Sequence, residues 1–404
     1  MRPSQPSPAL AARRRFLRRA AAAAAATLAP GAVERLLAAA AQGGCDDAPL
    51  GSLVRTLPLY GPGSVDTPLG TMLGGTGLDA RLFTDLSVLA PDRLTIPARD
   101  FFVRTAAPPR LSHDAATWTM QVGGGRGVAA HAVTAAAVAA KARPMGTHLV
   151  ECAGNSNPQN FGLMSAAAWD GVPLSDVIDL ARPPAGATAV LVSGVDDMTQ
   201  DSYRSTAGCS WVLPLADLPA LRPYLATRMN GEPLTPDHGA PVRLVVPGWY
   251  GCAWIKWVNE IRWVGADEPA TSQMLEFAGR THQEGRPTLA RDFAPPAIDT
   301  AAMPIRVEQR RVNGATEYRI VGIVWGGDRP VDQLVLRTSS RDRGTPVRVC
   351  PAPASSLTWS LWTHRWRPTE PGFYDISLRT ADASIRTRRL DLSFYIRRVK
   401  IDDV

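Results

Sequence analysis

Residues 148–155 read His-Leu-Val-Glu-Cys-Ala-Gly-Asn. The apolar start of this stretch is typical of a buried strand, and Cys152 follows where that strand would end. The small residues after Cys152 leave the backbone free to approach a ligand closely, and a thiolate suits a redox-active transition metal. A cysteine after a strand is by itself more often a small buried hydrophobic residue, so both interpretations stay open on this stretch alone.

Around this stretch, residues 96–296 alternate short apolar runs with helical patches. Further strands are predicted at 118–122, 189–192 and 242–246, an alanine-rich helix at 131–142 and the start of a helix at 173–178. This alternation of predicted strands and helices indicates a mixed α+β domain of about 200 residues.

The texture changes after Pro295-Pro296, which marks a predicted linker. Short apolar runs separated by turn residues predict strands at 318–325, 331–337, 347–349, 359–362 and 373–378. Residues 297–404 are therefore predicted to form a β-sandwich. Residues 42–95 show no clear period and are expected to form an N-terminal arm.

The first 41 residues have the composition of an export signal. Arg13-Arg14-Arg15-Phe16-Leu17-Arg18 matches the twin-arginine pattern, an alanine-rich stretch follows, and small residues near Ala38–Ala41 offer a cleavage site. We therefore expect a twin-arginine signal peptide over 1–41 and a periplasmic protein that is exported folded. Elsewhere no run of 18 apolar residues occurs, so no membrane span is expected after cleavage. Whether Cys45 is lipidated stays open.

Charge and cysteine usage exclude several classes of protein. Seven arginines and one acid give residues 1–41 a charge of +6, which leaves about +1 of the total of +7 for the rest. A nearly neutral body argues against nucleic-acid binding. The five cysteines include no C-x-x-C or C-x-x-C-H motif, which argues against structural zinc and against covalent haem in this chain. Hydrolase, P-loop and dinucleotide motifs are also absent.

A second candidate cluster runs from Asp237 to Trp257. Lys256 is one of only three lysines in a chain with 41 arginines, which suggests a need for a point charge. Together with His238 and Arg243, Lys256 could hold an anionic group such as a phosphate. A solvated turn with a chance lysine is the alternative.

Several separated stretches resemble the sulfite oxidase family of molybdenum enzymes. They are Phe101–Arg104, Glu151–Asn155, Trp169–Leu174 and Asp237–Trp257, while Gly322–Gly327 with Trp359–Trp362 is similar to the family's C-terminal immunoglobulin-like dimerisation domain. The similarity covers roughly residues 95–380 in consistent order, and it favours the metal-binding interpretation of Cys152. It implies a sulfite-oxidase-like mixed α/β molybdopterin domain followed by an immunoglobulin-like β-sandwich.

The resemblance also implies a cofactor and its ligands. Molybdenum would be held by one pterin dithiolene and by the Cys152 thiolate. His238, Arg243, Lys256, Asp196 and Thr105 would bind the pterin, and Arg104 would face the cofactor or an anionic substrate. A catalytic role falls to Arg104 and Cys152.

Two departures from the family pattern concern the substrate side. Ser156-Asn157 stand where the family has two arginines, and the family's active-site tyrosine falls on Phe277. Fewer polar groups weaken selection for a dianion such as sulfite. We therefore expect oxidation of sulfite or a related sulfur compound, with oxygen from water. Reduction of S-oxides or N-oxides on the same cofactor is the alternative, and a non-enzymatic scaffold is a third reading.

The partners follow from the same resemblance. Electrons would pass to a separate acceptor, such as a c-type cytochrome, because no haem is expected in this chain. The C-terminal domain would form a homodimer. The pairing of Cys209, Cys252 and Cys350 stays open.

Overall fold

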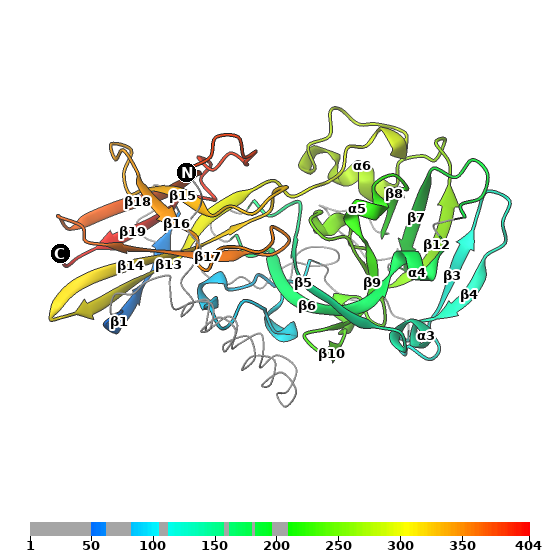
Figure 1. Cartoon of the computed structure of the whole chain (residues 1–404), viewed down its shortest axis with the longest axis horizontal. Coiled ribbons are helices and arrows are strands. Elements are labelled where there is room, and N and C mark those ends of the chain that lie inside the picture. Colours follow the sequence, from blue (N-terminus) through cyan, green and yellow to red (C-terminus); the bar gives the residue numbers. More distant parts are fainter. Residues whose placement is uncertain (1–49, 62–81, 105–111, 157–160, 180–181, 196–208) are drawn as a thin grey trace, which may run out of the picture. The chain divides into compact units, whose positions relative to one another are not determined.

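The computed structural model describes residues 50–61, 82–104, 112–156, 161–179, 182–195 and 209–404, and Figure 1 shows these parts as coloured ribbons. Within them the chain forms four β-sheets and a few short helices. We name each sheet by a central strand, as the β14, β18, β6 and β12 sheets. The predicted signal peptide and Cys45 lie outside the described residues.

Two of the sheets share one apolar core. The β14 sheet has the order β1-β13-β14-β17, with bounds Ser52–Leu57, Ala301–Val312, Ala315–Trp325 and Ser360–Trp366. The β18 sheet has the order β16-β15-β18-β19-β2, with bounds Thr345–Arg348, Gln333–Arg337, Gly372–Thr380, Arg397–Ile401 and Leu59–Tyr60. Ile320, Trp362, Leu336, Ile376 and Val399 belong to the core between them. Two antiparallel sheets around one core fit the predicted sandwich, whose immunoglobulin-like character stays a prediction.

The other two sheets share a larger core. The β6 sheet has the order β10-β9-β6-β5, with β11 also paired to β9, and the bounds are Glu232–Pro233, Tyr224–Met229, Met164–Pro173, Arg143–Glu151 and, for β11, Arg243–Val245. The β12 sheet has the order β4-β3-β12-β7-β8, with bounds His131–Thr134, Thr119–Gly124, Val258–Val264, Ala189–Gly194 and Cys209–Pro214. Their core extends to Ile323 and Trp325 of β14, so apolar packing is continuous with the β14 sheet.

The sequence predicted an α+β fold. In the described residues the helices are short, and most of the regular structure is strand. The α-helices are α3 to α6, with bounds Ala135–Ala139, Leu174–Val177, Leu218–Leu221 and Ser272–Phe277. The 3-10 helices are η1 to η6, with bounds Leu86–Val88, Ala98–Asp100, Pro236–His238, Gly251–Ala253, Ala278–Arg280 and Ala290–Asp292.

The helix predicted at 131–142 shows why. Residues His131–Thr134 pair with β3 as a strand, and the helix begins only after Thr134, whose hydroxyl accepts a hydrogen bond from the Ala137 amide at 3.2 Å. Alanine favours a helix, but a free strand edge beside it outweighs that intrinsic preference.

The first described part of the expected N-terminal arm, residues 50–61, is mostly strand, whereas residues 82–95 contain η1 and irregular backbone. Residues Ser52–Leu57 pair with β13, and Leu59–Tyr60 pair with β19. The predicted strands at 118–122, 148–150, 189–192 and 242–246 coincide with β3, β5, β7 and β11. The domain boundaries at 41, 95 and 296 stay predictions. Cys350 is disulfide-bonded, whereas Cys152 and Cys252 carry free thiols.

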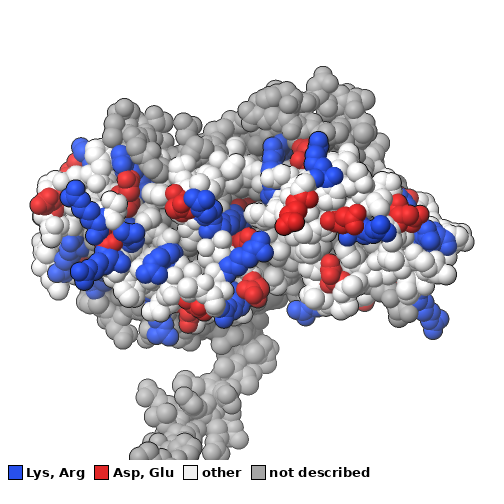
Figure 2. Space-filling view, turned by 90° about the horizontal axis from the view of Figure 1, so that it is seen from above, with Lys and Arg blue, Asp and Glu red and all other residues white. Residues whose placement is uncertain are grey.

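Basic and acidic side chains are interspersed over the face of the molecule seen in Figure 2. This mixture agrees with the nearly neutral body calculated from the sequence. Among the described residues, no helix combines the length and the hydropathy that a membrane span requires.

Glu317 holds two arginines at the surface of the β14 sheet. Its carboxylate accepts hydrogen bonds from Arg365 at 2.6 and 3.0 Å and from Arg367 at 3.1 Å. Burial is the largest single influence on the pKa of Glu317 and raises it. The two arginines together outweigh burial, so the pKa of Glu317 is lowered. A carboxyl group whose folded pKa is lowered stabilises the fold above its unfolded pKa and loses that contribution as the pH falls.

We predict that Glu317→Gln lowers the free energy of unfolding by about 1.5–3 kcal/mol at pH 7, the range for a hydrogen bond to a charged group. The deficit should shrink as the pH falls through the lowered pKa of Glu317, because the wild-type carboxylate is then protonated too. Urea unfolding at pH 7 and at acidic pH measures both values. Exposed Glu370 is the matched control, and an equal deficit at both pH values would contradict the account.

Candidate active site

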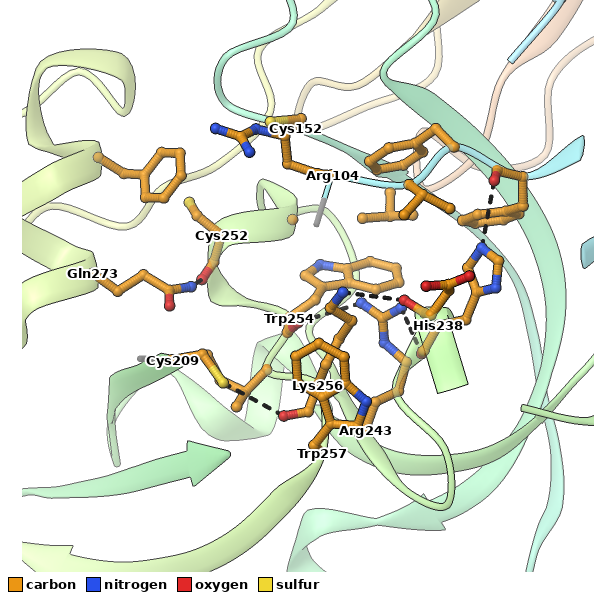
Figure 3. A pocket seen from close by; sticks show the side chains of 18 of the residues that line it. Arg104, Cys152, Cys209, His238, Arg243, Cys252, Trp254, Lys256, Trp257 and Gln273 are labelled. Atoms are coloured by element: carbon orange, nitrogen blue, oxygen red, sulfur yellow. Dashed lines mark hydrogen bonds between the residues drawn. The ribbon is translucent and has the colours of Figure 1, made fainter. Parts of the chain in front are cut away.

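One pocket gathers side chains that are far apart in the sequence (Figure 3). All five predicted site residues that lie in the described part of the chain line it, namely Arg104, Cys152, His238, Arg243 and Lys256. Cys152 and Arg104 lie at one end of the view, and Arg243 and Lys256 lie at the other, with Trp254 between them. Thr105 and Asp196 lie outside the described residues.

Cys152 directly follows β5 and is held by its backbone. Its amide donates to the Leu163 carbonyl at 2.9 Å, and its carbonyl accepts from the Asn155 amide at 2.9 Å. The Gly154 amide points at the Cys152 sulfur at 3.4 Å. Burial raises the pKa of the Cys152 thiol, while Arg104 and the Gly154 amide act in the opposite direction. The surroundings of Cys152 thus contain groups that favour the thiolate, the form that binds a metal.

Arg280 is a site residue that the sequence analysis missed. A Cβ atom built on Gly154 would lie 3.1 Å from Arg280 Nη1 and 3.7 Å from the Cys152 sulfur, so the guanidinium reaches the cysteine loop. Arg280 ends η5, just after α6, and Phe277 of α6 lines the pocket. A segment more than a hundred residues later thus places a second cation, besides Arg104, near Cys152, and no local sequence pattern marks it.

Arg243 is buried at the far end of the pocket. Its guanidinium donates to the carbonyls of His238 at 3.2 Å and Trp254 at 3.3 Å, and its central carbon lies 5.5 and 5.7 Å from the rings of Trp169 and Trp254. Burial lowers the pKa of Arg243 to about 10. Its Nε atom has no hydrogen-bond partner, and among the described residues no carboxylate pairs with it. A buried guanidinium with an unsatisfied donor leaves room for an anionic ligand.

Lys256 lies beside Arg243. Its ammonium donates to the Asp237 carbonyl at 3.1 Å and lies 4.2 Å from the centre of the Trp257 ring. Gly239 has φ +98°, and a Cβ there would lie 3.0 Å from Cβ of Lys256 and 3.1 Å from Cβ of Arg243. The glycine therefore lets the two cationic side chains approach each other.

His238 is buried between two hydrogen-bond partners. Its Nδ1 lies 2.6 Å from the Thr235 hydroxyl and its Nε2 lies 3.4 Å from the Phe101 carbonyl. Burial, followed by the charges of Arg243 and Lys256, lowers the pKa of His238 to about 3. The ring is therefore neutral at pH 7 and adds no charge to the pocket.

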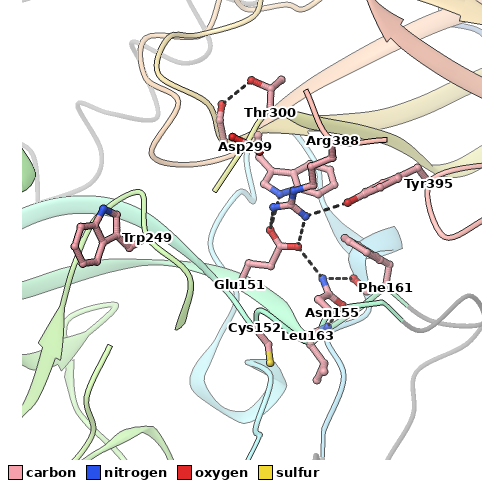
Figure 4. Close-up of polar contacts among 12 residues, drawn as sticks. Glu151, Cys152, Asn155, Phe161, Leu163, Trp249, Asp299, Thr300, Arg388 and Tyr395 are labelled. Carbon is pink, nitrogen blue, oxygen red and sulfur yellow. Dashed lines mark hydrogen bonds and ion pairs between the residues drawn. The ribbon is translucent and has the colours of Figure 1, made fainter. Parts of the chain in front are cut away.

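A buried ion pair lies behind the cysteine loop (Figure 4). Arg388 Nη1 and Nη2 donate to the two carboxylate oxygens of Glu151 at 2.8 and 2.7 Å. The Glu151 side chain is fully buried and also accepts from Trp325 Nε1 at 2.8 Å and from Asn155 Nδ2 at 3.3 Å. Tyr395 accepts a further hydrogen bond from Arg388 at 3.1 Å. The residue next to Cys152 is thus fixed to β14 and to the segment between β18 and β19.

The pocket suits a ligand with a metal at one end and an anionic group at the other. A soft thiol lies at one end, and the unsatisfied buried Arg243 with Lys256 lies at the other. Asp237 and Glu276 also line the pocket, so its charge is not purely positive. A molybdenum pterin with a phosphate group has this polarity, and the residues present therefore fit it.

Comparisons with known proteins agree with this geometry. Residues 106–272 match the family model described as the oxidoreductase molybdopterin binding domain. Human mitochondrial sulfite oxidase is 30% identical over 242 residues, which cover 54% of this chain and 43% of that protein. A nitrate reductase [NADPH] of Fusarium oxysporum is 38% identical over 98 residues, 24% of this chain and 10% of that protein. The chain spans between about a tenth and a half of the length of the curated relatives it matches.

A solved structure shares the fold. The sulfane dehydrogenase SoxCD from Paracoccus pantotrophus superposes with a TM-score of 0.61 at 18% identity, over 85% of this chain and 94% of that one. The ordered sequence motifs, the pocket and these matches agree. Residues 106–272 therefore form a molybdopterin-binding oxidoreductase domain, and the protein is an oxidoreductase of the sulfite oxidase type.

Proposed function

We propose that the protein oxidises sulfite or a related sulfur compound and passes the electrons to a separate acceptor such as a c-type cytochrome. The observation that carries this proposal is the pocket in which Cys152 and Arg104 lie opposite Arg243 and Lys256. For sulfite, one water supplies the added oxygen, two protons are released, and two electrons leave for the acceptor.

The proposed cofactor is molybdenum with molybdopterin. Cys152 would bind the metal through its thiolate, and Arg243 and Lys256 would hold the pterin phosphate. His238 would contact the pterin, and Thr105 and Asp196 complete the proposed set. When bound, the metal centre supplies the two-electron, oxygen-transferring chemistry that side chains lack.

Arg104 and Arg280 would bind the oxygen atoms of the substrate. Arg104 lines the pocket beside Cys152, and Arg280 reaches the Gly154 backbone next to it. Guanidinium groups form paired hydrogen bonds to oxyanions, so two of them favour a charged substrate. The cysteine motif lacks two arginines, and on that ground the sequence predicted a weaker preference for sulfite. Arg280 offsets this loss.

Reduction of S-oxides or N-oxides is the second candidate. The nitrate reductase match and the phenylalanine at position 277, in place of a tyrosine, favour it. Both candidates use the same cofactor pocket and differ in the direction of electron flow.

The cellular setting is proposed from the sequence. The twin-arginine motif supports export in the folded state to the periplasm, where a separate acceptor would receive the electrons. The homodimer proposed for the C-terminal sheets rests on family resemblance.

Glu151 and Arg388 are proposed to position Cys152 without touching the substrate. Glu151 precedes the cysteine in the chain, and its carboxylate oxygen accepts a hydrogen bond from Asn155 of the same loop. Asn155 in turn accepts from the Leu163 amide at 3.1 Å and donates to the Phe161 carbonyl at 3.4 Å. The loop geometry therefore depends on the ion pair.

Replacing Cys152 by serine should lower turnover by at least about 100-fold, because the alkoxide is a poor substitute for a soft thiolate ligand. Steady-state assays on purified protein, together with the molybdenum content per chain, give the measurement. Ser156→Ala, an exposed change in the same loop, should retain the wild-type rate. Full activity in Cys152→Ser would contradict both proposed activities.

Arg280→Met should raise the KM for sulfite by about tenfold or more, since a hydrogen bond to a charged group contributes about 1.5–3 kcal/mol. The assay follows sulfite-dependent reduction of ferricyanide or cytochrome c. Arg329→Met serves as control, because Arg329 pairs with Asp382 at the surface. If molybdenum-loaded protein does not oxidise sulfite but oxidises a reduced dye with S-oxides or N-oxides, the second candidate replaces the first.

Arg388→Met should lower the free energy of unfolding by about 3–5 kcal/mol, because it leaves the Glu151 carboxylate buried without its counter-ion. Adding Glu151→Gln to this variant should recover part of the loss. Denaturant unfolding measures stability, and molybdenum content per folded chain measures the positioning effect. Unchanged stability in Arg388→Met would show that the pair is dispensable.

A further inference from the structure

Arg397 is a charged residue at a core-facing position of β19. Burial alternates along this strand, so that Arg397, Val399 and Ile401 face inward while Lys400 faces solvent. Only 2% of the surface of Arg397 is exposed to solvent, close to the exposed fractions of Val399 and Ile401. An inward position that an apolar side chain would ordinarily occupy therefore holds a guanidinium.

No carboxylate pairs with Arg397 in the part of the chain that the structure describes. Its Nη1 donates to the neighbouring Ile396 carbonyl at 3.1 Å, and its Nη2 lies 4.0 Å from the Met303 sulfur. Burial lowers the pKa of Arg397 to about 10. The adjacent Arg398, by contrast, forms two hydrogen bonds of 2.7 Å to Asp375. Burying a charge without a counter-ion costs free energy of folding. We therefore ask whether a ligand could pair with Arg397.

Arg397 lines a cavity that is separate from the cofactor pocket. The walls of the cavity are about equally polar and apolar. They come from β13, from β1 and β2, from the η1 region and from the segment after the cysteine loop, and their apolar residues include Leu57, Leu59, Phe161 and Ile305. Exposed Asp85 and Ser87 of the η1 region also line it. The Asp85 carboxylate accepts from the Ser87 amide at 2.9 Å and from its hydroxyl at 2.7 Å, so it is engaged in its own turn.

The second arginine in the lining is already neutralised. Arg306 donates to Glu308 at 2.8 Å and to the Ser87 carbonyl at 3.0 Å. Glu308 also accepts from Arg310 at 2.6 Å. Two arginines line this cavity. Arg306 has a carboxylate partner, whereas Arg397 has none among the described residues.

We propose that this cavity binds a small organic oxyanion, a carboxylate or sulfonate that carries a short apolar group. The planar guanidinium of Arg397 matches the two oxygens of such a group, and the apolar side chains of the lining, among them Leu57 and Ile305, match its short tail. The site is distinct from the proposed cofactor pocket and does not depend on the proposed function.

The test uses the purified full chain with hexanoate and hexane-1-sulfonate as probes. A ligand that binds only the folded state raises the unfolding midpoint as its concentration increases. We expect the wild-type midpoint to rise by at least about 2 °C at 10 mM probe and not to rise with sodium chloride of equal ionic strength. Neutral 1-hexanol should give no comparable rise, because it lacks the charge that Arg397 recognises.

Variants assign the effect to Arg397. Arg397→Met should weaken probe binding at least tenfold by titration calorimetry, since it removes the cation and keeps an apolar chain of similar length. The matched control Arg398→Met, on the outer face of the same strand, should bind like the wild type. If Arg397→Met does not fold, Arg397→Lys is the second variant and should bind more weakly than wild type, because an ammonium lacks the paired donors.

Two results would overturn the proposal. The first is a wild-type midpoint that does not respond to either probe. The second is an equal response in wild type and in both Arg397 variants, which would place the binding elsewhere. Molybdenum content is recorded for each protein, so that a failure of the proposed enzymatic function is distinguishable from a failure of this site.

Discussion

The ion pair between Glu151 and Arg388 is the constraint on which the rest of the site depends. Both side chains are removed from water, and the cost of that desolvation is offset by two short hydrogen bonds and by further contacts to Trp325 and Tyr395. The Arg388 guanidinium also lies 5.2 Å from the centre of the Tyr250 ring. Because Glu151 immediately precedes Cys152, the proposed metal ligand is held by residues from β14 and from the segment before β19. The sheets after residue 296 are thus part of the site's support.

The strands of this fold were largely predictable. Of the two predicted helices, the one starting at 173–178 is confirmed by α4, whereas the one at 131–142 is mostly wrong in its bounds. Strand β7 and the buried end of β5 are short apolar runs, and the alternation of apolar and polar residues from Ile376 to Arg379 in β18 is visible in the sequence. The alanine-rich segment 131–142 misled the prediction, because helix propensity is a local quantity while the pairing of His131–Thr134 with β3 is a long-range one. The same limit hid β1, whose partner β13 lies about 250 residues away.

The cofactor side of the pocket was predictable for a different reason. Cys152, His238, Arg243 and Lys256 lie in compact motifs, where a thiol, a lysine among arginines and a nearby glycine can be read together. Arg280 and Arg388 carry no such signal. They are two among many arginines, and only the folded chain brings Arg280 to Gly154 and Arg388 to Glu151. Predictions about the substrate side were weaker because they considered Arg104 and the cysteine motif but had no means of placing Arg280 beside them.

Five arginines of the described residues are largely withdrawn from solvent and fall into two kinds, those bound to a carboxylate of the chain and those without one. Arg306, Arg310 and Arg388 each bind a carboxylate of the chain itself, so their charges are used inside the protein. Arg243 and Arg397 are buried more deeply, yet within the described residues their hydrogen bonds go to carbonyls or sulfur. Folding gains little from placing an uncompensated guanidinium in a low-dielectric interior. We therefore expect a ligand to complete such a charge, and this argument applies both to the proposed phosphate end of the pocket and to the proposed site beside β19.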